Sequence, residues 1–412
     1  RYMELFKREK YLSKIRPFYQ ADDIIKVITG VRRCGKSSLM ETILQELLYS
    51  GVNKENIIFL NLDSRKLRKI KTADQLEDLI ESMLTNNGEL NYLFIDEIQN
   101  VNGFEEVING FRNDGGISIF ITGSNSYLLS GELITKLTGR YLEFELFPLS
   151  FEEYEQIKHF YGKPTSPNLT VELNNYITEG GFPRAIFIDD IPAKMTYVKG
   201  IIEEIFEKDI RKRVKIKDTA TFDSVRRFII NNFGSTMSIN SIQKELAKNN
   251  INTGRQTITK YIKALIDSKI IYECDRFDMK SKKSLSGEKK YYLADLSFYF
   301  ADNTDNRINF GPTLENIVYI YAKSRDYSIS VGRIGKLECD FILRNKDNLY
   351  SYIQVAYTVA ESKATEDREY KPLENIRDNY SKYVITTDYL LQKRNGINHV
   401  NIMEFMTNEN EF

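Results

Sequence analysis

The chain has 412 residues, and its 58 basic and 58 acidic side chains give a formal net charge of zero at pH 7. A neutral chain has no overall field that would draw it to nucleic acid or to an anionic membrane, so any such affinity must be local. A chain of this length exceeds what one hydrophobic core usually serves, and we expect two to four domains.

Cysteine and histidine usage excludes several classes of site. The three cysteines, Cys34, Cys274 and Cys339, are widely spaced and odd in number, which argues against a disulfide framework or a cysteine-rich zinc site. With only two histidines, histidine catalysis and histidine metal sites are not expected. The apolar runs are far shorter than the ~20 residues of a membrane helix, and no signal-type core follows the basic start. The sequence therefore predicts a cytoplasmic protein.

The first third of the chain alternates short β-branched runs with helical patterns. After an N-terminal helical arm at residues 1–20, we assign residues 21–148 to one α/β core domain. Alternation of this kind is typical of a parallel sheet covered by helices. Strands are expected at residues 25–29, 57–61, 92–95, 117–122 and 141–146.

The next two segments are predominantly helical. Residues 149–215 have a helical apolar period interrupted at Gly180-Gly181-Phe182-Pro183, and we expect a small helical lid. Residues 216–301 contain three helical stretches followed by strand-like runs at 270–279 and 289–293. Helices followed by a hairpin are typical of a winged helix-turn-helix.

The last segment, residues 311–412, follows a polar stretch at 302–311 that we interpret as a linker. It mixes a helix at residues 314–325 with strands, and is predicted to be a separate α/β domain. The strands are expected at residues 328–333, 338–343, 350–355 and 383–387.

A phosphate-binding motif lies between the first expected strand and the helical pattern that follows it. Residues 30–37, GVRRCGKS, match G-x-x-x-x-G-K-[ST], in which backbone amides at a helix start point at phosphates. Lys36 can reach the β and γ oxygens, and the Ser37 hydroxyl can bind Mg²⁺. The alternative is a glycine turn with a surface lysine, which the flanking strand and helix disfavour. We predict an ATP and Mg²⁺ site whose nucleotide-binding residues include Gly30, Arg32, Arg33, Cys34, Gly35, Lys36, Ser37 and Ser38.

Two adjacent acids follow a buried strand downstream of this motif. In the run LNYLFIDE, Asp96 is predicted to hold Mg²⁺ through water, and Glu97 to orient or deprotonate the attacking water. A solvated turn is the alternative explanation for the pair. The strand after it ends in small polar residues, and Ser124 or Asn125 can hydrogen-bond the γ phosphate or that water.

Several motifs together resemble a known family. They are residues 30–37, 94–99 (FIDEIQ), 121–124 (ITGS), 137–140 (LTGR) and 147–153 (FPLSFEE). The combination resembles the archaeal and bacterial AAA+ ATPases of the AAA_14 type, which are similar to the archaeal branch of the STAND nucleotide-dependent switches. The resemblance implies that Asp96 is the magnesium-site acid, Glu97 the water activator and Asn125 or Ser124 the sensor. It also implies an arginine finger or sensor role for Arg140, within or between chains; alternatively, Arg140 only caps a strand.

The glycine-proline break in the helical segment is similar to the Gly-x-Pro element with which STAND lids touch adenine. The resemblance implies that Pro183 lies against the base and that Arg184 adds charge near the phosphates. An ordinary helix stop would explain the same residues.

The third helix of the predicted winged helix has one apolar face and one basic face. Arg255, Lys260 and Lys263 lie on the basic face, as in a recognition helix. The hairpin after it adds Lys280, Lys282, Lys283, Lys289 and Lys290, and we predict double-stranded DNA contact through the helix and through Lys282 and Lys283. Winged helices also dock proteins, and lysines in a wing are often a solvated loop.

The last domain looks like the restriction-endonuclease fold. Glu315 on a helix, Asp340 on a strand and Gln354 on the next strand match its metal-site positions, and weak metal binding by them stays open. Gln354 stands where a second strand acid is expected and Ala356 where a lysine is expected, which counts against two-metal cleavage. We predict an inactive nuclease-like domain that binds a partner or nucleic acid; an unrelated α/β domain is the alternative.

Three functions follow from these residues. The leading hypothesis is a slow ATPase switch whose nucleotide state changes what the C-terminal domains engage, whether DNA, a protein partner or another copy. The alternatives are a DNA-binding regulator with ATP as a structural ligand and a metal-dependent nuclease.

Overall fold

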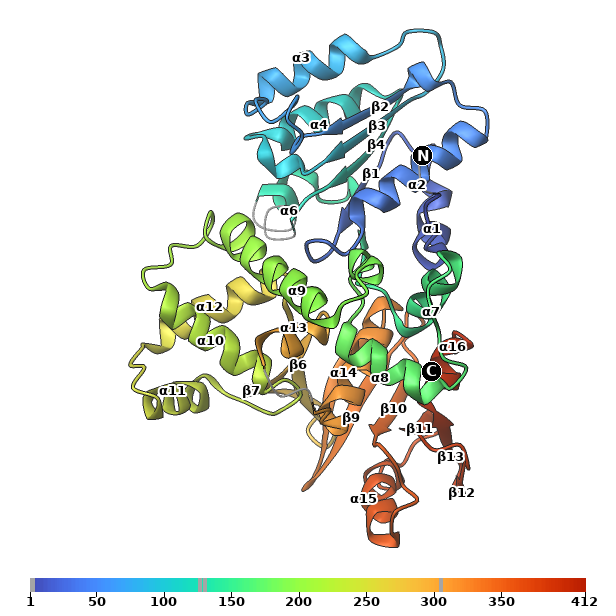
Figure 1. Cartoon of the computed structure of the whole chain (residues 1–412), viewed down its shortest axis with the longest axis vertical. Helices are drawn as coiled ribbons and strands as arrows, with labels where there is room; N and C mark the ends of the chain where they lie inside the picture. Colours follow the sequence, from blue (N-terminus) through green and yellow to red (C-terminus); the bar gives the residue numbers. More distant parts are fainter. Residues whose placement is uncertain (1–3, 125–127, 129–131, 304–306) are drawn as a thin grey trace. The chain divides into compact units, whose positions relative to one another are not determined.

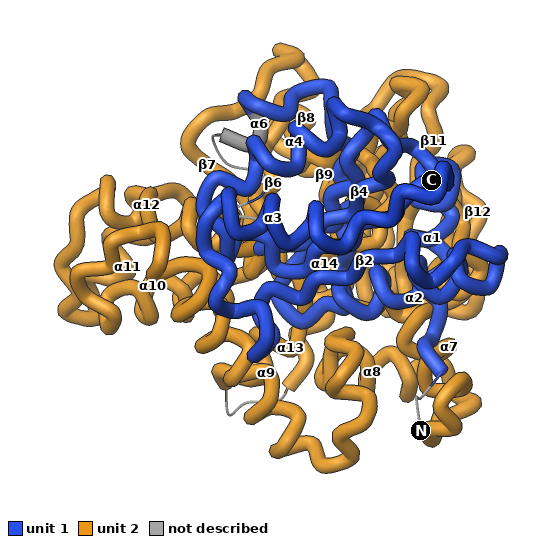
Figure 2. Tube along the Cα trace, turned by 90° about the horizontal axis from the view of Figure 1, so that it is seen from above, with its two compact units in different colours: residues 1–148 blue, residues 149–412 orange. Residues whose placement is uncertain are grey.

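The computed structural model of the chain describes residues 4–124, 128, 132–303 and 307–412. The chain divides into two compact units, residues 1–148 and 149–412 (Figure 2). The first unit is built on a five-stranded sheet and the second on an eight-stranded sheet. Within the described ranges, every helix is too short or too polar to cross a membrane.

The first unit contains the expected parallel α/β core. Its strands pair in the order β2-β3-β4-β1-β5, and every neighbouring pair is parallel. This mixed α/β arrangement confirms the predicted P-loop NTPase type of sheet. In chain order the elements are α1 (Glu9–Ile15), β1 (Ile25–Thr29), α2 (Lys36–Tyr49), β2 (Ile57–Asn61), α3 (Ala73–Met83), β3 (Asn91–Asp96), α4 (Phe104–Asp114), β4 (Ile117–Thr122), α6 (Glu132–Leu137) and β5 (Tyr141–Glu145).

Both faces of this sheet are covered. Helices α3 and α4 lie along one face (Figure 1), and alternate apolar residues of β1 to β4 form a single core with them. On the other face, the rings of Phe59 and Phe94 lie 6.2 Å apart and those of Phe94 and Phe120 lie 4.7 Å apart. Burial on both sides explains why β1, β3 and β4 read as continuous apolar runs.

One lysine breaks that apolar pattern. Lys26 on β1 is fully buried, its Nζ donates to Ala21 O at 2.5 Å and to Ser118 Oγ at 2.8 Å, and it lies 4.6 Å from the centre of the Phe120 ring. Burial lowers the pKa of Lys26 to about 7, against the attraction of Asp23 and Asp22. In the unfolded chain the lysine has its ordinary pKa of 10.5. Between about pH 7 and pH 10.5 the lysine is therefore protonated in the unfolded state and neutral in the folded state.

The free energy of unfolding of the first unit should therefore rise with pH between about pH 7 and pH 10.5. We expect a contribution of up to about 1.4 kcal/mol per pH unit from this one group, and Lys26→Met should lack it. Denaturant unfolding at a series of pH values measures the slope. Lys66→Met, at an exposed position, is the control and should keep the wild-type slope. Equal slopes for wild type and Lys26→Met would contradict the assignment.

The second unit begins with helices. They are α7 (Phe151–Phe160), α8 (Leu169–Glu179), α9 (Ile191–Ile205), α10 (Thr219–Asn231), α11 (Ile239–Lys248) and α12 (Arg255–Asp267). The rest comprises β6 (Ile271–Asp278), β7 (Lys283–Leu293), α13 (Ser297–Asp302), α14 (Phe310–Ser324), β8 (Ser328–Ile334), β9 (Leu337–Arg344), β10 (Tyr350–Val355), α15 (Lys363–Glu374), β11 (Ser381–Thr386), β12 (Lys393–Arg394), β13 (Ile397–Asn401) and α16 (Ile402–Thr407).

The eight strands of this unit form one sheet in the order β12-β13-β11-β10-β9-β8-β6-β7. The hairpin β6-β7, predicted to belong to the segment 216–301, pairs through β6 with β8 of the last segment, with Arg276 opposite Val331. The segments predicted as lid, winged helix and C-terminal domain therefore lie in one compact unit. Strand β7 begins at Lys283 rather than 289 because its first residues are mostly polar and exposed, so no apolar alternation marks them.

Candidate functional site

The P-loop follows β1 and leads into α2. Gly30 has φ of 146°, and a Cβ placed on it would lie 2.2 Å from Leu146 O, so only glycine fits here. Gly35 has φ of 110° and caps α2, which starts at Lys36. The loop therefore ends at the amide-rich start of a long helix, as phosphate binding requires.

The side chains predicted to hold phosphate and Mg²⁺ converge at this helix start. The Ser37 hydroxyl donates to Asp96 Oδ2 at 2.6 Å. Lys36 is buried, and its Nζ donates to Gly30 O at 2.8 Å and to Val31 O at 3.1 Å. The P-loop and the end of β3 thus place an ammonium, a hydroxyl and a carboxylate at one site.

Asp96 is held by a residue that the sequence did not identify. The Thr122 hydroxyl, at the end of β4, donates to Asp96 Oδ1 and accepts from the Glu97 amide at 3.2 Å. Burial raises the pKa of Asp96, and the hydrogen bonds from Ser37 and Thr122 oppose that rise. The only sequence signal for Thr122 is a hydroxyl residue at the end of a strand, where neighbouring parallel strands also end.

Glu97 has an uncommon backbone conformation, and its carboxylate has one hydrogen-bond donor and one nearby guanidinium. Its φ is 59°, in the left-handed region. Gln99 Nε2 donates to Glu97 Oε2, and the Arg32 guanidinium lies 3.9 Å from the same oxygen. A Cβ on Gly123 would lie 2.3 Å from Gln99 Oε1, so Gly123 leaves the space that Gln99 occupies. Gln99 and Arg32 therefore orient the predicted water activator.

The end of β4 also carries an unsatisfied hydroxyl. Ser124 Oγ is buried and has no hydrogen-bond partner among the described residues. Such atoms are rare in folded proteins, and a ligand oxygen would satisfy this one. The observation fits Ser124 as the sensor; Asn125, the other candidate, lies outside the described residues.

The remaining P-loop residues have structural neighbours. Cys34 is buried, burial raises the pKa of its thiol, and the neutral thiol donates to Leu146 O at 3.5 Å. Arg8, just before α1, donates to Cys34 O at 3.0 Å and to Phe147 O at 2.7 Å. The N-terminal arm therefore braces the P-loop, which no motif revealed. Arg33 is exposed within the P-loop, and Ser38 is exposed in the first turn of α2.

Arg140 precedes β5, the neighbour of β1, and therefore lies at the opposite end of the strands from the P-loop. It is exposed, its carbonyl accepts from the Ile25 amide at 2.9 Å, and it directly precedes β5. Because β1 and β5 are parallel and in register, the Arg140 backbone lies level with residue 24, six residues before Gly30. At 3.3 Å per residue this is a separation of about 20 Å along the strand. This position does not fit a role at its own nucleotide site, and a role at the site of another chain stays a prediction.

The glycine pair before Pro183 has a packing reason within the second unit. A Cβ on Gly180 would lie 2.2 Å from Asp295 Oδ1, and the Gly181 amide donates to Asp295 Oδ2 at 2.7 Å. Pro183 begins a short 3-10 turn, and Arg184 is exposed. Contact of Pro183 with adenine stays a prediction.

The predicted nucleic-acid residues differ in their surroundings. Arg255 and Lys260 are exposed on α12, and Lys263 is exposed but paired with Asp267 at 2.9 Å. Lys282 and Lys283 are exposed at the turn between β6 and β7.

The basic hairpin is smaller than predicted. Lys289 pairs with Glu273 at 2.5 Å and with Asp275 at 3.2 Å, so its charge is balanced locally. Lys290 is buried rather than exposed, because alternation along β7 turns it toward the acids of the C-terminal segment.

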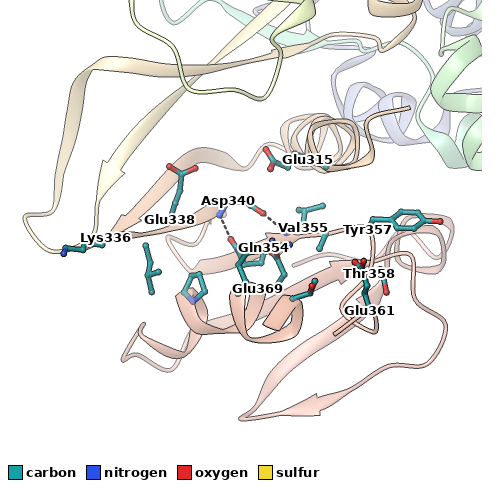
Figure 3. Close-up of a pocket in the computed structure, with 16 residues that line it drawn as sticks. Glu315, Lys336, Glu338, Asp340, Gln354, Val355, Tyr357, Thr358, Glu361 and Glu369 are labelled. Atoms are coloured by element: carbon teal, nitrogen blue, oxygen red, sulfur yellow. Dashed lines mark hydrogen bonds and ion pairs between the residues drawn. The ribbon is translucent and has the colours of Figure 1, made fainter. Parts of the chain in front are cut away.

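Glu315, Asp340 and Gln354, predicted as remnants of a nuclease site, do line one pocket of about 540 Å³ (Figure 3). Both ends of the Gln354 amide are engaged: Oε1 accepts from the Asp340 amide at 2.7 Å, and Nε2 donates to Glu369 Oε2 at 3.2 Å. Asp340 Oδ2 accepts from the Val355 amide at 2.8 Å. Over the described ranges, no three Asp, Glu, His or Cys side chains are grouped to hold a metal ion.

A lysine reaches these acids from a different strand than expected. Lys290 Nζ lies 2.9 Å from Glu338 Oε1 and 3.8 Å from Glu315 Oε2. Burial alone would lower the pKa of Lys290, but the carboxylates of Glu315, Asp340 and Glu338 raise it. Burial raises the pKa of Asp340, and the negative charge of Glu315 adds to that rise. Position 356, where a lysine was expected, holds alanine, but Lys290 of β7 brings a positive charge to Glu315, Asp340 and Glu338.

Comparisons with known proteins agree with the core fold. The AAA domain family AAA_14 matches residues 22–155, and a domain of unknown function, DUF8612, matches residues 170–304. A Walker-type ATPase of Pyrococcus abyssi has a similar structure, with a TM-score of 0.51 and 16% identity, over 73% of this chain and 97% of that chain. At this identity the likeness shows the fold alone. The resemblance to AAA_14-type AAA+ proteins is confirmed.

Two relatives match nearly the whole chain. An uncharacterised protein of Haemophilus influenzae is 35% identical over 404 residues, which is 98% of this chain and 98% of its own length. An uncharacterised protein of Methanocaldococcus jannaschii is 30% identical over 386 residues, 91% of this chain and 84% of its own. The chain therefore belongs to the same family as these two relatives, and its first unit carries the AAA domain of the AAA_14 type.

Proposed function

We propose that the chain is an ATP-binding and ATP-hydrolysing switch of the AAA+ and STAND-like type, whose nucleotide state controls binding of DNA or protein by its second unit. The hydrogen bond between Ser37 Oγ and Asp96 Oδ2, at 2.6 Å, carries the proposal. It joins the P-loop hydroxyl to the strand-end acid at the position where a phosphate-bound Mg²⁺ is expected.

The residues at this site fit ATP and Mg²⁺. The amides that follow Gly30 and the start of α2 would hold the phosphates, with Lys36 neutralising their charge, while Ser37 and Asp96 would hold Mg²⁺. When bound, Mg²⁺ supplies positive charge to the β and γ oxygens.

The catalytic roles fall to residues at the ends of β3 and β4. Glu97 orients a water and accepts its proton, and Gln99 and Arg32 position the Glu97 carboxylate. Ser124 donates its unused hydrogen bond to the γ phosphate. Thr122 keeps Asp96 in place through its side chain.

Steady-state phosphate release from ATP and Mg²⁺ tests the proposal. A switch should show slow release over many turnovers. Release of no more than one equivalent would instead favour the second candidate, a DNA-binding regulator with ATP as a structural ligand. The order of elements in residues 216–301 supports this second candidate, because it is the order of a winged helix-turn-helix. The elements are the helices α10, α11 and α12, the β-bridge between Met237 and Lys289, and the hairpin β6-β7.

We propose that the C-terminal segment acts as a binding module and not as a nuclease. Gln354 is committed to hydrogen bonds, and the described acids do not form a three-ligand group. Plasmid incubated with wild-type protein and Mg²⁺ or Mn²⁺ should stay intact, as it should with Asp340→Ala. Cleavage by wild type that disappears in an identically purified Asp340→Ala preparation would overturn this assignment.

A further inference from the structure

A strongly basic segment joins α9 to α10. Residues 211–217, RKRVKIK, contain five basic residues and no acid, although the chain as a whole is neutral. All five basic residues of the segment are exposed. Arg211 forms an exposed ion pair with Glu207 at 3.0 Å. Charge of one sign concentrated in this way acts locally, because salt screens it beyond about 8–10 Å.

This segment is fixed beside α12 and does not form a loose loop. Lys260 Nζ of α12 donates to Lys215 O at 3.0 Å. Backbone amides of Arg211 and Val214 donate to Phe206 O and Ile210 O, at 2.8 and 2.9 Å. These hydrogen bonds connect the segment to α12 at Lys215 and to the residues that follow α9 at Arg211 and Val214.

Three buried aromatic rings hold the flanking elements together. The Phe206 and Phe222 rings lie 5.1 Å apart, and those of Phe222 and Tyr261 lie 5.2 Å apart. They join the end of α9, α10 and α12, and Figures 1 and 2 show α10 and α12 side by side. The elements on both sides of the basic segment are therefore packed on the same buried rings as α12.

We propose that residues 211–217 and the exposed face of α12 form one surface, the α12 basic surface, that binds the backbone and groove of double-stranded DNA. Its members are Arg211, Lys212, Arg213, Lys215, Lys217, Arg255, Gln256, Thr259 and Lys260. This surface rests on the proposed function, in which the second unit binds DNA. Residues 211–217 would make most of the phosphate contacts, and α12 would enter the major groove.

The chemistry of the α12 basic surface favours B-form DNA over other polyanions. Phosphate contacts position a protein, and base-edge contacts come from side chains such as Arg255 and Gln256 on a helix that enters the major groove. The major groove of A-form RNA is too narrow for a helix. Single strands are bound through exposed aromatic rings, but residues 211–217 contain none and Tyr261 is buried.

Fluorescence anisotropy with a labelled, mixed-sequence duplex tests the inference on the full chain, without nucleotide, with ADP and with ATP. The test variant is Lys212→Gln/Lys215→Gln/Lys217→Gln. We expect its Kd for the duplex to rise by roughly tenfold or more, and the slope of log Kd against log salt to fall by roughly 2 to 3, since each phosphate contributes about 0.9. The matched control, Lys54→Gln/Lys66→Gln/Lys69→Gln, loses the same charge from exposed positions in the first unit and should bind like wild type.

Several outcomes would overturn the inference. The first is an equal Kd for the test variant and wild type at an unchanged melting temperature, and the second is an equal loss of duplex affinity in the control variant. The third is no duplex binding in any nucleotide state. The fourth is tighter binding of a single strand, an RNA duplex or polyglutamate than of the DNA duplex. Phosphate release by wild type and the test variant is measured without DNA. If wild type binds the duplex but releases no phosphate, the proposed ATPase switch is refuted and the α12 basic surface stands. If wild type releases phosphate but does not bind the duplex, the α12 basic surface is refuted and the ATPase stands.

Discussion

Lys36→Ala should weaken ATP binding on the order of 100-fold, because a hydrogen bond to a charged group contributes about 1.5–3 kcal/mol and this lysine makes its contacts in a buried site. In the structure its Nζ is held between the carbonyls of Gly30 and Val31, pre-positioned at the P-loop. Titration calorimetry with ATP and Mg²⁺ measures the change.

Two controls separate binding from folding in that experiment. Lys66→Ala removes an exposed lysine of the same unit and should keep the wild-type Kd. A thermal melt of Lys36→Ala without nucleotide should show a folded protein, although two carbonyls lose a donor. A folded Lys36→Ala variant with wild-type affinity would refute the assignment of the nucleotide site.

Glu97→Gln should bind ATP normally and hydrolyse it about 10²- to 10⁴-fold more slowly, the usual contribution of a general base. The substitution keeps the shape of the side chain, and the amide oxygen can still accept from Gln99 Nε2. It removes the negative charge near Arg32 and the capacity to take a proton from water. ATP affinity and the rate of phosphate release must both be measured, because we expect the rate to fall and the affinity to stay the same.

Glu81→Gln, at an exposed position on α3, is the matched control and should release phosphate at the wild-type rate. If Glu97→Gln also releases phosphate at that rate, Glu97 is not the water activator. A variant that loses ATP affinity as well would point to a binding role for Glu97 instead. The Glu97→Gln protein, held with ATP, is also the form in which crosslinking can test whether Arg140 reaches a neighbouring chain.

The sequence by itself determined the motifs of the candidate nucleotide site. Residues 30–37 need only a strand, a glycine-bearing turn and a helix start, which local backbone preferences specify. Asp96 ends a buried strand and Glu97 follows it, and a strand that is buried on both faces reads as an apolar run in any context. The parallel five-stranded core could be predicted for the same reason: each strand carries its own signal.

Tertiary structure alone decided which distant side chains complete each site. Thr122 reaches Asp96 because β3 and β4 are neighbours in the sheet, and Arg8 braces Cys34 O across 26 residues of chain. Lys290 joins the acids of the C-terminal segment because the hairpin β6-β7 continues that segment's sheet. Local patterns report whether a residue is buried and on which element it lies. They do not report which strand becomes its neighbour, because pairing depends on packing between segments that are far apart in the chain.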